Sequence, residues 1–154
     1  MANPLIWGVE SWGPALVARW KTIVDNQKAS MKAFDFDKLP SAIKEVPTAL
    51  SMISEPVELS YSEGDFCQAV WKGRTQFYLS LNQNLASYNY VYPFYRKITE
   101  AAAGKLTLGG KVELFTIGQI SPALLTWGSE TEYMGLVVPW TITEDISGKL
   151  TVGV

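Results

Sequence analysis

The sequence predicts a single α+β domain over residues 1–154, a mostly antiparallel sheet flanked by two main helices on one side. Three observations lead to this prediction. An apolar stripe with helical spacing lies near the start of the chain, several short strand-like segments follow, and a second helical segment then interrupts the strands. The length of 154 residues is that of one domain. The predicted order of elements is α-β-β-β-α-β-β.

The first predicted helix is defined by apolar residues at helical spacing, namely Leu16, Trp20, Ile23 and Val24. Pro14 precedes this stripe, and proline is favoured at the first position of a helix. We therefore expect the helix to begin near Pro14 and to reach Asp25. The residues before it, about 1–13, are expected to form an irregular amino-terminal arm that carries Trp7 and Trp12.

Three or four antiparallel strands are predicted next, over residues 49–53, 57–61, 66–71 and 75–81. In the second of these, Val57, Leu59 and Tyr61 alternate with polar residues, as in a half-buried strand. The last two strands are expected to form a hairpin, because Lys72-Gly73-Arg74 is a suitable short connection.

The second predicted helix begins at Pro93 and stops at Gly104, with a polar loop over Asn82–Asn89 before it. After it, Gly109 and Gly110 predict a tight turn. Strands are then expected over Lys111–Ile117 and Tyr133–Thr143, with a short apolar segment between them. Pro139 lies inside the last strand, which favours an edge position or a bulge there.

Composition argues against several classes of function. The net charge is −2, whereas binders of nucleic acid or anionic membranes normally carry a basic excess. The absence of histidine removes Ser-His-Asp and Cys-His catalysis and the usual zinc triads. The single cysteine, Cys67, is expected to be a buried core thiol. No segment approaches the ~20 consecutive apolar residues of a membrane span, so we expect an aqueous, reducing compartment.

The candidates for catalysis or ligand binding are interpreted as solvated loops. Asp35 and Asp37 lack the further oxygen ligands and the glycine of a calcium loop. Glu130 and Glu132 lie two residues apart in a polar turn, which favours solvation over an acid–base pair. Leu108–Lys111 lies between a helix and a strand, the wrong order for a phosphate loop. We expect no catalytic, cofactor-binding or metal-binding residue, and hence no enzyme.

An aromatic cluster surrounds Tyr88, Tyr90 and Tyr92. Two interpretations stay equally open for it: a loop packed onto the sheet, and an oligomer interface, where Tyr and Trp are favoured. A stacking platform for bases is the weaker option, because no basic residue is interleaved before Arg96, and we expect no recognition of nucleic-acid sequence. The candidate interface residues are Trp7, Trp12, Tyr88, Tyr90, Tyr92, Trp127, Glu130 and Glu132.

Charge is distributed unevenly along the chain. After residue 112 the charged residues are mainly acids: Glu113, Glu130, Glu132, Glu144 and Asp145, against Lys149. The first 32 residues have a basic excess: Arg19, Lys21, Lys28 and Lys32, against Glu10 and Asp25. Ordinary solvated faces are the favoured interpretation. The alternative is that the basic helix and the acidic sheet end meet between neighbouring subunits.

Several short motifs occur in the second half of the chain. Tyr92-Pro93 leads a helix of the type Ile98-x-x-Ala101-Ala102, and Leu108-Gly109-Gly110-Lys111-Val112 follows. The final strand contains Tyr133 and Gly135 and ends Trp140-x-Ile142-x-Glu144. In these motifs, over roughly residues 85–154, and in its order of elements, the chain resembles the tail terminator (tail-completion) proteins of long-tailed bacteriophages.

The resemblance implies a structural protein of the virion, made in the host cytoplasm and located in the tail or neck. Similar family members form hexameric rings that cap the tail tube and join it to the head connector. The partners implied are therefore further copies of the chain, a tail tube protein and a head-completion or connector protein. The family has no catalytic residues, so none carries over. The alternative is a small-ligand-binding α+β domain with an aromatic-lined pocket between helices and sheet.

Overall fold

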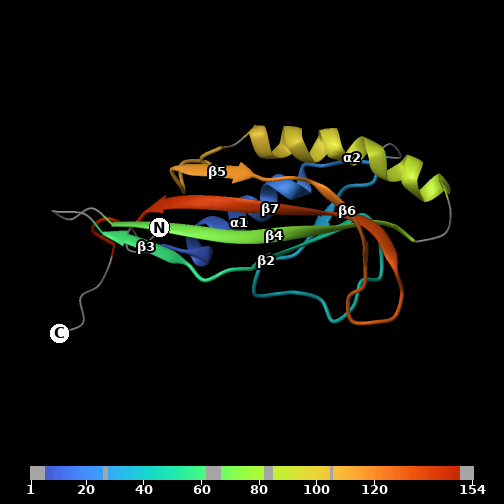
Figure 1. Ribbon diagram of the computed structural model, residues 1–154, viewed down its shortest axis with the longest axis horizontal. Coiled ribbons are helices and arrows are strands. Elements are labelled where there is room, and N and C mark those ends of the chain that lie inside the picture. Colours follow the sequence, from blue (N-terminus) through green and yellow to red (C-terminus); the bar gives the residue numbers. More distant parts are fainter. Residues whose placement is uncertain (1–5, 26–27, 62–66, 82–84, 105, 150–154) are drawn as a thin grey trace.

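The computed structural model describes residues 6–25, 28–61, 67–81, 85–104 and 106–149, and only the backbone of residues 85–88. Two helices lie against a mixed sheet of seven strands (Figure 1). The elements are α1 (Val9–Lys21), β1 (Lys32–Ala33), β2 (Thr48–Ile53), β3 (Glu58–Tyr61), β4 (Cys67–Leu81), α2 (Leu85–Ala103), β5 (Leu114–Ile117), β6 (Ser121–Leu125) and β7 (Tyr133–Asp145). The predicted α+β class is confirmed, and the predicted order is matched roughly.

The sheet is organised around the antiparallel pair of β4 and β7. Their register runs from Gln68 opposite Asp145 to Leu81 opposite Tyr133, with one irregularity between Tyr78 and Ser80. The strand order is β1-β2-β4-β7-β5, with β3 also pairing with β4 and β6 also pairing with β7. Only β1 and β2 pair in parallel among the described strands, so the sheet is mostly antiparallel as predicted.

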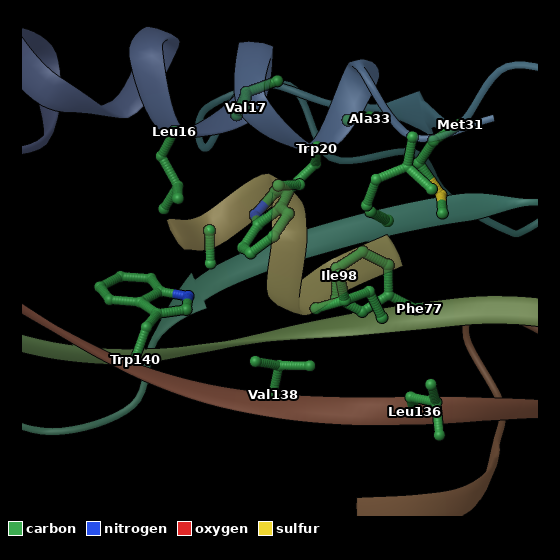
Figure 2. Close-up of a cluster of buried hydrophobic side chains, with 14 of the residues drawn as sticks. Leu16, Val17, Trp20, Met31, Ala33, Phe77, Ile98, Leu136, Val138 and Trp140 are labelled. Atoms are coloured by element: carbon green, nitrogen blue, oxygen red, sulfur yellow. The ribbon is translucent and has the colours of Figure 1, made fainter. Parts of the chain in front are cut away.

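Both helices pack on one face of the sheet, where the main hydrophobic core lies. Helix α1 contributes Trp12, Leu16 and Trp20, and α2 contributes Phe94 and Ile98, all buried. Figure 2 shows the side chains of α1 directed toward the strands, with those of β4 and β7 opposite them. A smaller cluster lies apart from this core, around residues of β2, β4 and the two segments 34–46 and 123–137, namely Ile43, Leu50, Tyr78, Leu125 and Tyr133.

The start of α1 corrects the prediction of an irregular arm over residues 1–13. The helix begins at Val9, and Pro14 lies inside it. Proline disfavours helical backbone in the residue before it through a clash with that residue's Cβ, and this residue is Gly13, which has none. The helix also ends at Lys21, before Asp25, where Thr22 closes it with an N–H bond to the Arg19 carbonyl.

A buried carboxylate fixes the beginning of α1. Both oxygens of Glu144, which is fully buried, accept the backbone N–H of Gly8, at 3.0 and 3.1 Å. The indole Nε1 of Trp71 donates to the same carboxylate at 3.1 Å. A negative group at the amino-terminal end of a helix is favourable, because the free N–H groups there carry partial positive charge. Glu144 is thus an internal anchor, and not part of the acidic surface predicted from the sequence.

The predicted hairpin over residues 66–81 is wrong, because β4 is one continuous strand through Gly73. A Cβ built on Gly73 would lie 2.4 Å from the ring of Trp140 on the neighbouring strand. The glycine therefore makes room for a fully packed indole, and does not turn the chain. The indole Nε1 of Trp140 donates to Thr75 Oγ1 at 3.1 Å, and Thr75 in turn contacts Ser51 Oγ at 2.8 Å.

Helix α2 begins at Leu85, so the predicted loop over residues 82–89 is helical in its described part, and Pro93 lies inside the helix. Burial explains the longer helix: Val91, Phe94 and Ile98 place apolar side chains in the core on both sides of the proline. Packing of this stripe offsets the loss of one backbone bond at Pro93.

The remaining strands differ from prediction mainly at the edges of the sheet. All four residues of β3 are exposed, so it is not the half-buried strand expected from its alternation. Strand β5 begins at Leu114 and not at Lys111. Pro139 lies in the central strand β7 and not at an edge of the sheet. Its carbonyl accepts the N–H of Gly118 at 2.8 Å, so its backbone nitrogen faces the short connection between β5 and β6. No ladder hydrogen bond is lost there, because that connection is not part of a strand.

Replacing Glu144 by Leu should destabilise the protein by about 2–4 kcal/mol. The change leaves two donors, the Gly8 N–H and the Trp71 indole, without their acceptor, and each unmet donor costs roughly 1–3 kcal/mol when buried. Urea unfolding followed by tryptophan fluorescence measures the loss. The control is Glu132→Leu, an exposed position expected to change stability by less than about 0.5 kcal/mol. Equal stability of the two variants would contradict the anchoring role.

Candidate functional site

A positively charged groove lies between the carboxyl-terminal end of α1 and the second half of α2. Its volume is about 340 Å³. The groove, called here the basic groove, is lined by Arg19, Thr22, Ile23, Val24, Arg96, Lys97, Glu100 and Ala101. Three of these side chains are basic and one is acidic, so the groove is suited to bind a negatively charged group.

Two cations of the basic groove are held by backbone carbonyls. Arg19 donates through Nε and Nη2 to the carbonyl of Ala101, both at 3.1 Å. Lys97 Nζ donates to the carbonyl of Val24 at 2.7 Å and lies over the ring of Phe94. Ala101 lies in the last turn of α2, where carbonyls lack intrahelical partners and carry partial negative charge, so a bound cation is favourable there. Val24 lies beyond the end of α1, in the segment that follows it. These bonds give the basic side chains fixed positions.

Gly104 lies against the guanidinium of Arg19. It directly follows α2, and its N–H donates to the Glu100 carbonyl at 3.0 Å. A Cβ built on Gly104 would lie 2.8 Å from Nη2 of Arg19. The sequence predicted this glycine as a helix stop. The structure adds that a larger side chain at this position would shift the guanidinium of Arg19 from where it bonds to Ala101.

Tyr90 is tied to the segment beside the basic groove and is not an open stacking platform. Its hydroxyl donates to Asp25 Oδ2 at 2.6 Å, and the other oxygen of Asp25 accepts the N–H of Ala29 at 2.7 Å. Burial, reinforced by the hydrogen bond and the negative charge of Asp25, raises the pKa of Tyr90 above its ordinary value. Tyr92 is exposed, and the side chain of Tyr88 lies outside the described residues.

The second surface feature is the connection between β6 and β7, residues 126–132, called here the acidic turn. Glu130 and Glu132 are both exposed on it, as predicted for a solvated turn. Its base is fixed: Trp127 Nε1 donates to the Pro40 carbonyl at 2.7 Å. Gly128 has a φ of 70°, and a Cβ there would overlap the Ser41 carbonyl oxygen. Trp127 therefore holds the turn in place while the glutamates face solvent.

The two amino-terminal tryptophans have different positions. Trp12 is fully buried, with ring contacts to Trp140 at 5.5 Å and Phe36 at 5.6 Å between centroids. It is a core residue of α1, so its assignment to an interface is wrong. Trp7 is half-buried beside Trp71, at 6.1 Å between centroids. The Nε1 atoms of Trp12 and Trp20 are buried without a hydrogen-bond partner among the described residues.

The described residues include no group of three or more side chains placed to hold a metal ion. Asp35 lies 4.0 Å from Lys38 Nζ, and Asp37 is exposed. Cys67 is buried, as predicted.

No described helix combines the length and apolar character needed to cross a bilayer. Comparison of the chain with models of known protein families and with curated proteins found no match.

Replacing Arg19 by Met should lower the free energy of unfolding by about 1–3 kcal/mol. Met keeps much of the apolar stem but removes both bonds to the Ala101 carbonyl, a loss of the size expected for hydrogen bonds from a charged donor. Lys21→Met is the matched control, because Lys21 is exposed two residues further along the same helix. Chemical denaturation of both variants compares them. Equal free energies of unfolding for the two variants would show that the bonds of Arg19 to the Ala101 carbonyl do not stabilise the fold.

Proposed function

We propose that this protein is a structural subunit of a phage tail or a related tail-like particle, a tail terminator that assembles into a ring. The ring caps the tail tube and joins it to the head connector. The observation that carries the proposal is the exposure of apolar side chains at both edges of the sheet. One edge carries Leu59 and Tyr61 of β3, and the other carries Leu114 of β5 and Leu124 of β6.

The β3 edge offers a site for strand addition. Strand β3 pairs with β4 on one side, and its four residues are all exposed, with 68% of Tyr61 accessible to solvent. An edge strand presents backbone N–H and C=O groups that can pair with another chain. Proline is one common protection against such pairing, and β6 contains Pro122. Strand β3 has no proline and a single charge, Glu58, and none of the described strands pairs with its other side.

Two different edges are what ring formation needs. In a closed ring each subunit meets two neighbours through two different surfaces, one on each side. Opposite edges of one sheet satisfy this requirement with a single fold. The likeness to tail terminators in the motifs of residues 85–154 supports the particular kind of ring, and with it a location in the tail or neck of the virion.

Ligand binding is the second candidate, and one hollow favours it. The space between helices and sheet is filled by Trp12, Trp20 and Trp140, each fully or almost fully buried. A surface hollow of about 370 Å³ lies instead beside the first half of α1. It is lined by Val9, Glu10, Gly13, Pro14, Asp35, Phe36, Asp37 and Lys38. A ligand there would have to be small, partly apolar and positively charged.

The wild-type protein should form rings visible by electron microscopy and a discrete oligomer by light scattering. Leu59→Asp should shift it toward monomer, because a charge in an apolar contact must be desolvated without a partner. Leu81→Asp is the matched control, since Leu81 is equally exposed, 43% against 40%, but lies at the end of the central strand β4. A wild-type protein that stays monomeric at high concentration, alone and with tail tubes, would overturn the proposal.

A further inference from the structure

The basic groove has donor capacity left for a negatively charged partner. An arginine guanidinium carries five N–H donors, and the two contacts with Ala101 engage only part of them. Arg96 is paired with Glu100 at 3.3 Å, but their side chains are 69% and 63% exposed. An exposed pair of this kind contributes little in water, so it can rearrange at small cost when another carboxylate arrives.

The acidic turn has the complementary chemistry and shape. Residues 126–132 contain Glu130 and Glu132 and no basic residue. Their base is held by Trp127 and by the close approach of Gly128 to Ser41. A turn fixed in this way loses little conformational entropy when it binds, which favours its use as a docking element.

The turn and the groove are placed where they cannot meet within one subunit. The turn is fixed to residues 40–43 and joins the cluster that contains Tyr133, apart from the helix-covered core. The groove lies between α1 and α2. Figure 1 shows α2 above the sheet and the connection from β6 to β7 extending below it. A contact between these two features therefore has to join different subunits.

We propose that the acidic turn of one subunit docks into the basic groove of the next subunit. This inference rests on the proposed ring, and it names a polar part of the contact between neighbours. Because turn and groove are different surfaces, the contact is head-to-tail, the type that builds rings. Glu130 and Glu132 bind the guanidinium of Arg96 and the remaining donors of Arg19. The charge complementarity inside one sequence favours a second copy of the chain as the occupant of the groove.

The test uses charge reversal on each surface. Arg96→Glu alters the groove, and Glu130→Lys with Glu132→Lys alters the turn. Each change should weaken self-association at least about tenfold at low salt, because like charges then face each other. Combining both changes in one chain places the lysines of the altered turn opposite the glutamate introduced at position 96 and should restore assembly in part, because Arg19 and Lys97 stay cationic. The controls are Lys44→Glu and Asp37→Lys, exposed charges outside both surfaces, which should assemble as wild type.

Mixing the two single-surface variants gives the sharper result. The groove variant keeps a normal turn and the turn variant keeps a normal groove, so one correct contact forms between them. The mixture should recover rings in which the two variants alternate, seen by native mass spectrometry, because the altered groove of one variant then faces the oppositely charged altered turn of the other. Association should also weaken when salt is raised from about 0.1 M to 1 M, as the screening length falls from about 10 to 3 Å.

The outcomes separate the two proposals. Wild-type rings that persist unchanged in the Arg96→Glu and turn variants would overturn the docking inference and leave the ring proposal standing. Loss of rings in both variants without rescue by the combined change would also overturn the inference, because the two surfaces would then act separately. A monomeric wild type, alone and with tail tubes, would overturn the ring proposal itself.

Discussion

The pairing of β4 with β7 is the constraint on which the other elements depend. Strand β4 has 15 residues and β7 has 13, and each carries other strands along its free side. Two such strands can pair over their full length only if neighbouring side chains on each face of the sheet fit together. Gly73 opposite Trp140 provides that fit, because the indole occupies the space that any other side chain at Gly73 would fill. The hydroxyl of Thr75 then accepts the indole N–H, so the ring is packed and also hydrogen-bonded.

The same pair of strands positions α1. Glu144 near the end of β7 and Trp71 on β4 meet at the Gly8 N–H, just before the helix begins. From that point Trp12, Leu16 and Trp20 follow the core at helical spacing, and Arg19 reaches across to the Ala101 carbonyl of α2. The basic groove is therefore a consequence of how α1 is anchored. Its walls hold their relative positions because both ends of α1 are tied to other elements.

The sequence predicted the class of fold, the helix-covered face and most strands, because these depend on apolar periodicity that local patterns report. It misplaced elements where glycine and proline have tertiary roles. Gly73 resembles a turn residue until the indole of Trp140 is placed beside it, and Pro14 and Pro93 resemble helix starts until buried residues are found before them. The acidic turn was predicted, since its charges are local. The groove was not, because it joins residues about 80 positions apart, as in the bond of Arg19 to Ala101.

Apolar edges and paired charges would have different roles in an assembly of this chain. Burial of Leu59, Tyr61 and their counterparts at the opposite edge supplies a non-directional driving force, which by itself would allow several relative positions of two edges. Strand edges can also slip in register when their side chains do not specify one alignment. A charged turn in a charged groove discriminates between alignments, because a displaced carboxylate loses its partner and stays partly desolvated. A ring closes only if every contact between subunits repeats one geometry. In the proposed interface, the contact between the acidic turn and the basic groove is the part that can fix this geometry.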